Sequence, residues 1–391
     1  MAYLKGLAAE GFDVHLLTFE KIRHAPDREG VIREGLRADG IHWHSLRYHK
    51  APSLPATLYD IAQGTLLAGG LCRRHGIRLV HGRSHVGTAI ARLAARRGRV
   101  PFVFDVRGLL ADEYVDAGRW GEGGLKYRLT KKAERRLLRE AEGVVVLTRV
   151  LERELVGIPG VLRPDVRLEV IPCCVDTAAY RSAASHRHEE RSRRGWHGRR
   201  VLLYLGKLGG WYLEKEIARF FAAARKCDPA FRLQVLTQSD PRPLTRALVT
   251  EGVPPEAYSV GRSAPEDTPR IAAAADVGLS LIRPCASKRS SSPTKVGEYL
   301  AAGLPLVSTS GIGDCDAIVR DERLGVILES FGEEQLRRAT AQLETLLGEP
   351  ATRERCRAYA ERELSMSGVG VPRYARLYRL LLGTGRGANS E

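Results

Sequence analysis

The sequence predicts an α/β protein built from two doubly wound parallel-sheet domains. Short apolar runs alternate with helical patterns along the chain, and this alternation is typical of parallel βαβ units. The scheme occurs once in each half of the 391 residues, and a polar, charge-dense stretch, 181–200, separates the halves. Each half, roughly 180 residues, is long enough for one such domain, with ligands expected beyond the carboxyl ends of its strands.

Apolar runs in both halves fit the description of buried strands. In the first half they are Val14–Phe19, Ile41–Leu46, Arg78–His81, Pro101–Asp105, Val144–Thr148 and Leu168–Ile171. In the second half they are Val201–Leu205, Arg232–Thr237, Tyr258–Val260, Val277–Ile282, Leu304–Ser308 and Gly325–Leu328. Helical patterns fill the intervals, as parallel sheets require.

The most informative stretch is SSSPTKVGEYLAAGLPLVSTSGIGD, residues 290–314. Its apolar residues fall at helical spacing from Val296, and Ser292 followed by Pro293 is a good helix start, with the serine as N-cap. Gly303 can end the helix in a left-handed conformation, and the apolar run after it predicts a buried strand. Serine hydroxyls and free backbone N–H groups then gather at the positive end of a helix, where anions bind.

The formal net charge of +16 suits a nucleic acid, an anionic membrane surface or a phosphorylated substrate. The basic residues are spread along the chain without zinc-finger spacing, an aromatic RNP-type segment or a basic zipper, so nucleic acid is disfavoured. The densest basic stretch is residues 126–142, where Leu129, Ala133, Leu137 and Ala141 make one apolar stripe on a helix. Both a solvated helix face and a patch that meets anionic lipid are open for it.

Seven cysteines are scattered without C-x-x-C spacing, so the sequence indicates neither a disulfide framework nor a zinc site, and it fits a reducing cytosol. No stretch approaches the ~20 apolar residues of a membrane span. The N-terminus also lacks a basic region followed by an apolar core, so we expect a cytoplasmic protein.

Residues 290–314 resemble the donor-site segment of a known family, the retaining, nucleotide-sugar-dependent glycosyltransferases of family 4. The match is P-x-K-x-x-E-Y-L-A-x-G-x-P, supported by IPCCVD (171–176), AAADVGLSL (273–281) and YLGKLGGWY (204–212). The resemblance covers nearly the whole chain. It implies the GT-B fold, with two Rossmann-like domains facing a central cleft and the donor bound by the second.

The resemblance implies donor-binding roles for Ser292, Thr294, Lys295 and Glu298. Glu298 would accept both ribose hydroxyls, while the N–H groups of Thr294 and Lys295 and the Lys295 ammonium would hold the diphosphate. In the family a second glutamate precedes, separated by seven residues, and this chain has Ser290 there, so one carboxylate of the pair is absent. The alternative reading of Glu298 is an exposed helix carboxylate.

The glycines after the first strand of the second half form another part of the expected donor site. Gly206, Gly209 and Gly210 lie between an apolar strand and a helical pattern, where they allow the backbone to approach phosphates closely. The family often carries an Arg after the first glycine, for which Lys207 can stand in, whereas Leu213 occupies the approximate place of a further Lys. The alternative for each glycine is a simple turn.

In the first half, residues 104–120 follow an apolar strand with a dense set of charges, where a cleft-lining loop is expected. Asp105 and Arg107 are the predicted catalytic residues. Because retaining enzymes of this class are understood to work by front-face attack within an ion pair, they need positioning and charge stabilisation more than a nucleophile. Arg107 would steady the leaving phosphate or an anionic acceptor, and Asp105 would orient the acceptor or pair with Arg107. His81 and His85 are expected to be structural.

We therefore expect a glycosyltransferase that moves a sugar from a nucleotide-sugar donor to a hydroxyl of a glycan or lipid-linked acceptor with retention of configuration. An anionic membrane surface is a candidate partner, which would place the protein at the inner face of the membrane. The nucleotide sugar is a substrate, and no cofactor or metal is expected. The alternatives are a GT-B nucleotide-sugar epimerase and a catalytically silent sugar- or nucleic-acid-binding protein.

The expected domains are an acceptor-side domain at 1–180, a linker at 181–199 and the donor domain at 200–365. A C-terminal helix within 366–391 is expected to pack back on the first domain and to end in a flexible tail. The chain opens with a helical pattern that Gly11 closes, whereas in the family a strand and a glycine-rich loop precede that helix. We expect a first domain that lacks its first central strand and has open ladder edges, as in a piece of a longer natural protein.

Overall fold

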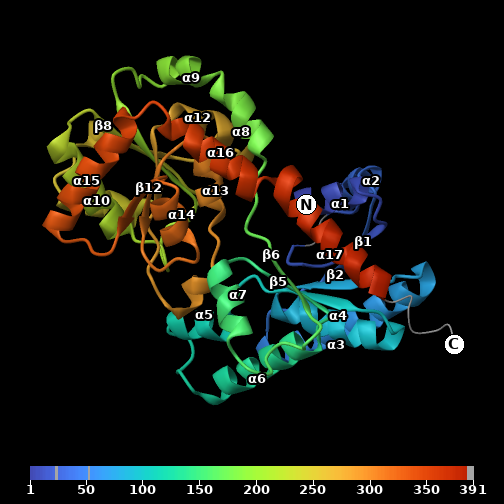
Figure 1. Ribbon diagram of the computed structural model, residues 1–391. Helices are drawn as coiled ribbons and strands as arrows, with labels where there is room; N and C mark the ends of the chain where they lie inside the picture. The colour runs from blue at the N-terminus through green and yellow to red at the C-terminus, as the bar shows by residue number, and fades with distance from the viewer. Residues whose placement is uncertain (23–24, 52, 385–391) are drawn as a thin grey trace. The chain divides into compact units, whose positions relative to one another are not determined.

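The computed structural model describes residues 1–22, 25–51 and 53–384 (Figure 1). They form two compact units: unit 1 comprises Met1–Ile171 and the residues from Val369 onward, and unit 2 comprises Pro172–Gly368. Each unit is an α/β domain whose strands pair in parallel, so the predicted fold class is confirmed. None of the described helices combines the length and the apolar character needed to cross a bilayer. Residues 385–391, the end of the segment 366–391 for which a helix and a flexible tail were predicted, lie outside the described residues.

All the predicted strands are present, with ends that differ by no more than two residues from the expected ones. Those of unit 1 are β1 (Val14–Glu20), β2 (Ile41–Arg47), β3 (Val80–Arg83), β4 (Phe102–Asp105), β5 (Gly143–Val146) and β6 (Arg167–Val170). Those of unit 2 are β7 (Arg200–Leu205), β8 (Phe231–Leu236), β9 (Tyr258–Gly261), β10 (Val277–Ser280), β11 (Leu306–Thr309) and β12 (Gly325–Leu328).

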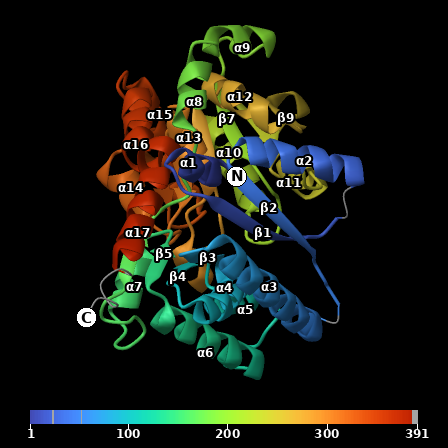
Figure 2. The same cartoon turned by 90° about the vertical axis from the view of Figure 1, so that its right-hand side faces the viewer.

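The strands of unit 1 form two separate sheets, β1-β2 and β3-β4-β5-β6 (Figure 2). Among the described residues no strand pairs with the free edge of β1 or of β3. Every residue of β1 is half-buried, whereas every residue of β4 and β5 is buried. In the described part of unit 1, β1 and β3 therefore each have one unpaired edge.

Helices cover both faces of the four-stranded sheet of unit 1. On one face Leu137 and Leu151 pack from α6 and α7, and on the other Leu7 and Leu377 pack from α1 and α17. The helix α17 crosses this second face in Figure 1. The helices of the unit are α1 (Ala2–Ala9), α2 (Pro26–Ala38), α3 (Ser53–His75), α4 (Ser84–Gly98), α5 (Leu110–Asp116), α6 (Leu125–Glu140), α7 (Arg149–Val156) and α17 (Val371–Thr384).

Unit 2 has one six-stranded parallel sheet with the order β12-β11-β10-β7-β8-β9. Alternate residues of its strands face two apolar layers, so that Leu203 packs with α12, α13 and α16, and Leu202 packs with α10, α11 and α15. The helices of the unit are α8 (Thr177–Ala184), α9 (Arg187–Arg193), α10 (Glu214–Cys227), α11 (Arg242–Thr250), α12 (Thr268–Ala274), α13 (Thr294–Ala301), α14 (Cys315–Asp321), α15 (Glu333–Gly348) and α16 (Thr352–Leu364).

Residues 181–199, predicted as a linker, belong to unit 2 and contain the end of α8 and all of α9. Two arginines of α9 hold the segment in place. Arg187 donates to the carbonyl oxygens of Ala273 and Ala275, and both Arg187 and Arg191 pair with Asp276. The charges that indicated a solvated linker thus cap the end of α12, and the units divide at Ile171 instead.

Candidate functional site

The order of strands in unit 2 reverses between β7 and β10, its topological switch point. In open parallel sheets, ligands bind beyond the carboxyl ends of the strands at such a point. The predicted glycines lie in the loop after β7, and α13 begins in the connection from β10 to β11. Both predicted donor-site segments therefore lie at the end of the sheet where a ligand is expected.

The helix α13 begins after Pro293, and no side chain of the residues that the structure describes caps its first N–H groups. Ser292, predicted as the N-cap, instead accepts a hydrogen bond from the backbone N–H of Cys173 at 3.1 Å. The predicted cap is wrong because the serine oxygen connects this segment to residues 171–176. The N–H groups of Thr294 and Lys295, in the first turn, have no helical partners and point out of the positive helix end.

Lys295 is a buried cation near the start of α13. Its side chain is buried, and its Nζ meets no acceptor among the described residues. Nζ lies 4.3 Å from the ring centroids of both Tyr204 and Tyr212, whose faces attract the positive charge. Burial lowers the pKa of Lys295 to about 7, although the charge of Glu298 acts to raise it. An anionic ligand would relieve this unfavourable state.

The glycine loop lies against this lysine. A Cβ atom built on Gly206 would lie 3.8 Å from the Nζ of Lys295, and Gly206 and Gly209 have φ values of +116° and +83° that favour glycine. Tyr212 forms an isolated β-bridge with Ile282 just after β10, which holds the loop at the switch point. Lys207 is exposed on the same loop. The structure therefore brings the predicted site residues Gly206 and Lys295 close together.

Glu298 lies one helical turn after Lys295 and is half-buried. Burial raises the pKa of Glu298, while the nearby hydroxyl of Tyr180 in α8 and then the charge of Lys295 act to lower it. Glu298 is therefore not a fully exposed helix carboxylate, which was the alternative reading.

Two further groups near this loop were not predicted from the sequence. Trp211 follows the two glycines, and its indole N–H is buried without an acceptor in the described part of the chain. The Nζ of Lys288, a buried residue, lies 3.9 Å from the centroid of the Trp211 ring. Ser290, at the position of the absent carboxylate, is buried and donates its hydroxyl to the carbonyl oxygen of Ser287. The adjacent Trp211 and Tyr212 were the feature of the sequence that could have indicated these groups, since a buried indole needs an acceptor.

In unit 1, Asp105 ends β4 and lies in a buried polar network under α17. Its carboxylate accepts a hydrogen bond from the hydroxyl of Tyr374 at 3.1 Å and lies 3.5 Å from the Nε2 of His81 and 3.7 Å from Arg107. The hydroxyl of Tyr378 lies 2.7 Å from the other ring nitrogen of His81. Burial acts to raise the pKa of Asp105, but His81 and then Arg107 leave it below its usual value.

The two predicted catalytic residues, Asp105 and Arg107, differ in their exposure to solvent. Asp105 is 2% exposed, so its carboxylate does not meet solvent, whereas Arg107 is half-buried. His85 is also buried, and its Nε2 lies 2.8 Å from Glu134, which accepts a hydrogen bond from Lys131. His85 thus contacts a buried carboxylate, whereas the Nε2 of His81 lies 3.5 Å from the carboxylate of the predicted site residue Asp105.

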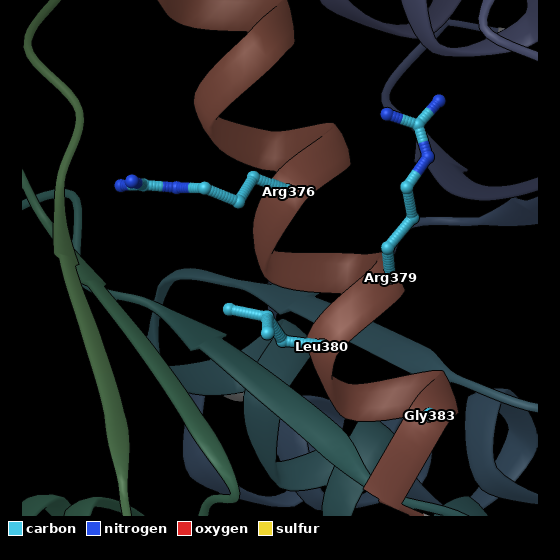
Figure 3. Close-up of a pocket in the computed structure, with 4 residues that line it drawn as sticks. All are labelled: Arg376, Arg379, Leu380 and Gly383. Carbon is cyan, nitrogen blue, oxygen red and sulfur yellow. The ribbon is translucent and has the colours of Figure 1, made fainter.

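A pocket of about 470 Å³ lies beside α17 and is lined by Arg376, Arg379, Leu380 and Gly383 (Figure 3). Figure 3 shows the two arginines extending from different sides of the helix. Arg376 pairs with Glu169 of β6, and Arg379 pairs with Glu10. Because both cations are already neutralised, this pocket offers less to an anionic ligand than the switch point of unit 2.

Comparison with known families finds two successive domains. Residues 1–174 match the glycosyl transferase 4-like domain, and residues 199–345 match the glycosyl transferases group 1 domain. No curated protein sequence matches the chain.

Many solved structures have the same fold. Sucrose-phosphate synthase from Thermosynechococcus elongatus is similar over 98% of this chain and 92% of its own, with a TM-score of 0.70 and 16% identity. Anabaena Alr3699/HepE in complex with UDP is similar over 97% and 96%, with a TM-score of 0.69 and 14% identity. WaaG, a glycosyltransferase involved in lipopolysaccharide biosynthesis, is similar over 93% and 98%, with a TM-score of 0.63 and 18% identity. These proteins share the GT-B architecture with the chain.

Proposed function

Since the chain belongs to the GT-B glycosyltransferases, with a 4-like domain followed by a group 1 domain, we propose that it transfers a sugar from a nucleotide-sugar donor with retention of configuration. The sugar is a hexose, and the acceptor is a hydroxyl of a glycan or lipid-linked molecule, as in polysaccharide biosynthesis. The Anabaena neighbour with UDP supports a nucleotide donor, and WaaG supports such an acceptor.

The observation that carries this proposal is the position of the Lys295 Nζ, which lies beside the Gly206 backbone and meets no acceptor in the described parts of the chain. A donor diphosphate placed there would accept hydrogen bonds from Lys295 and from the first-turn N–H groups of α13. Glu298, one turn further along, would accept the ribose hydroxyls. We assign Gly206, Lys207, Gly209, Ser292, Thr294, Lys295 and Glu298 to donor binding on this basis.

In the proposed reaction the acceptor oxygen forms a bond to the anomeric carbon while the bond from that carbon to the diphosphate oxygen breaks. The electron pair of the broken bond leaves with the diphosphate, and the acceptor proton passes to it. Negative charge therefore grows on the leaving phosphate, where Lys295 and the helix N-terminus stabilise it. With these cationic groups in place, we propose that transfer needs no metal and no cofactor.

For unit 1 we propose that Arg107 acts on the acceptor or the leaving phosphate. Asp105, being buried, would act through its neighbours, because its carboxylate pairs with Arg107 and His81. This makes Asp105 a positioning residue instead of a group that contacts substrate. Loss of its charge should therefore alter the orientation of Arg107 and His81 more than donor affinity.

The surface of α6 supports a lipid-linked acceptor. The predicted apolar stripe is divided: Leu137 and Ala141 are buried, whereas Leu129 is 58% exposed and Leu125 at the helix start is 74% exposed. The cations Lys126, Arg128 and Lys132 are exposed on the same helix. Exposed leucines among cations are typical of helices that lie on anionic membranes. We propose a cytoplasmic protein that binds the inner face of the membrane peripherally.

The proposed function is tested by thermal shift followed by product analysis. UDP-sugars are used first because of the neighbour that binds UDP, followed by other nucleotide sugars, and a ligand at about 100 times its Kd adds about 2.7 kcal/mol to stability. Release of nucleoside diphosphate is then measured with and without candidate acceptors. Retention is read from the anomeric configuration of the product by NMR. Lys207→Ala and Lys215→Ala form a matched pair, because both lysines are exposed but only Lys207 lies on the glycine loop.

The outcomes separate the proposal from its rivals. Acceptor-dependent release of diphosphate supports transfer. A nucleotide sugar recovered with an inverted ring carbon and no diphosphate release would identify an epimerase. Binding without turnover in any acceptor mixture would identify a silent binding protein, and no binding to any nucleotide would overturn the assignment of the donor site.

A further inference from the structure

Several histidines gather at the amino ends of β1 and β2 in unit 1. His15 of β1 is directly opposite His42 of β2 in the parallel register, and His44 follows two residues later on the same face. The rings of His15 and His42 stack with centroids 4.7 Å apart. His75, from the last turn of α3, packs against His15 with a centroid distance of 4.4 Å. The strand register and α3 therefore concentrate four imidazoles in one place.

A carboxylate completes the group. Asp13 precedes β1, and its two oxygens face different imidazoles: one lies 3.3 Å from the Nε2 of His42 and the other 3.6 Å from the Nε2 of His15. One ligand atom from each of these residues lies within 4.8 Å of the others. Two imidazole nitrogens and a carboxylate oxygen that converge from three side chains are the donor set that zinc uses when water fills the remaining position.

The orientation of His15 is fixed by a second histidine. The Nδ1 of His15 lies 3.1 Å from the Nε2 of His44, so a proton on Nδ1 donated to His44 leaves the Nε2 lone pair of His15 directed at Asp13. Metal-bound histidines commonly donate their second ring N–H in this way, which fixes tautomer and ring orientation. The side chain of His15 is 7% exposed, while those of His42 and Asp13 are 47% and 66% exposed. The group is thus anchored on one side and open to solvent on the other.

From this geometry we propose that Asp13, His15 and His42 bind one divalent zinc ion, with His44 as the positioning residue for His15. Water completes the coordination on the exposed side. The ion joins the segment before β1 to the start of β2. Ligands of the transfer reaction are expected at the carboxyl ends of strands, and this group lies at the amino ends, so the ion stabilises unit 1 and takes no part in sugar transfer.

The site is tested by titrating metal-free full-length protein with Zn²⁺ in a calorimeter, under reducing conditions. The expected result is one ion per chain, bound by the wild type. His42→Gln should raise the Kd at least about 100-fold, and His44→Gln about tenfold, the usual effect of removing a residue that orients a ligand. His186→Gln is the matched control, because His186 is a half-buried histidine of unit 2 outside the group.

Cysteine thiols could also bind Zn²⁺, so a second measurement distinguishes a cysteine site from the histidine site. Cys227 is the exposed cysteine of the chain, and Cys227→Ser should leave Zn²⁺ affinity unchanged. Co²⁺ in place of zinc should give visible d–d bands without thiolate-to-metal charge transfer, and these bands should disappear in His42→Gln. Circular dichroism and nucleotide binding of the variants should match the wild type, since His42 is exposed and outside the donor site.

The proposal is overturned if the wild type binds no Zn²⁺ at micromolar concentration. Equal affinity in wild type and His42→Gln would also overturn it, because the metal would then be held elsewhere. A charge-transfer band in the cobalt spectrum would assign the metal to cysteine and reject the histidine site.

Discussion

Lys295 gives the sharpest test of the donor site, because its proton is lost at the pH where the protein is studied. Without a ligand, burial lowers the pKa of this lysine from 10.5 to about 7. A bound diphosphate places negative charge beside Nζ and favours the ammonium. Binding must therefore take up a proton whenever the pH exceeds the pKa of the free protein.

The magnitude follows from the size of this shift. With a pKa of about 7, about one tenth of the free protein has a neutral lysine at pH ~6 and about nine tenths at pH ~8. Proton uptake on binding should rise from about 0.1 to about 0.9 over this range, and the Kd should rise about tenfold. A nucleotide sugar is the right ligand, since its diphosphate diester does not titrate between these pH values.

The assay is isothermal titration calorimetry in buffers of different ionisation enthalpy, which measures proton uptake directly. Lys295→Met should bind the donor more weakly, by about 1.5 to 3 kcal/mol, and with an affinity independent of pH. A wild-type protein that binds the donor tightly with no proton uptake at pH ~8 would refute the assigned contact.

The same substitution has an opposite effect on folding. Between pH ~7 and pH ~10 the unfolded lysine holds a proton that the folded one lacks, so stability rises with pH through this window and is reduced below it. Lys295→Met removes this cost and should raise the free energy of unfolding at neutral pH by a few kcal/mol. Weaker binding together with higher stability is the signature of a residue retained for a ligand.

Three further predictions concern single elements. Glu298→Ala should weaken nucleotide binding by about 2 to 4 kcal/mol, whereas Tyr180→Phe, which removes only the hydroxyl near Glu298, should change it by less than about 1 kcal/mol. Unchanged affinity in folded Glu298→Ala would reject ribose binding. Reversal of the exposed cations Arg128, Lys132 and Arg135 should reduce sedimentation with anionic vesicles, as should salt, and wild-type protein that ignores such vesicles at low salt would contradict the membrane proposal. Lys131 is left unchanged in that variant because it pairs with Asp112 and Glu134. Gly278→Ala should destabilise unit 2 by about 1 to 3 kcal/mol in denaturant titrations, because the added Cβ would lie 2.3 Å from the ring of Tyr299; a change below about 0.5 kcal/mol would show that the ring can move.

The strands were predictable because most of them are short apolar runs, and β4, β5 and β10 are buried on both faces, which leaves a local signal. The role of residues 181–199 was not, since Arg187 and Arg191 bind carbonyl oxygens and a carboxylate more than 80 residues away. Local composition shows where charged residues lie in the sequence, but it does not show which helix end they will contact in the fold. The false N-cap at Ser292 has the same origin, because its partner Cys173 is 119 residues distant.

The candidate site also combines features that the sequence predicts with features that it does not. The meeting of Gly206 with α13 follows from βαβ topology, which places loops after neighbouring strands at one edge. The burial of Lys295 between Tyr204 and Tyr212 and the contact of Glu298 with Tyr180 depend on side-chain packing, which periodicity does not encode. The histidine group of unit 1 likewise requires the register that sets His15 opposite His42.

The return of α17 to unit 1 bears on how the protein is made. During synthesis, residues 1–171 leave the ribosome well before α17. The hydroxyl of Tyr374 in α17 donates a hydrogen bond to Asp105, and Leu377 packs in an apolar cluster with Val103 and Val145. Roughly 200 residues separate the two parts of this unit, which at about 5 to 20 residues per second means a delay of about 10 to 40 s. Over that interval the part of this sheet face that α17 will cover stays exposed in the nascent N-terminal unit, whereas the sheet of unit 2 is complete before α17 emerges. Unit 2 can therefore fold first, and chaperones that bind nascent chains would find their longest-lived target in unit 1.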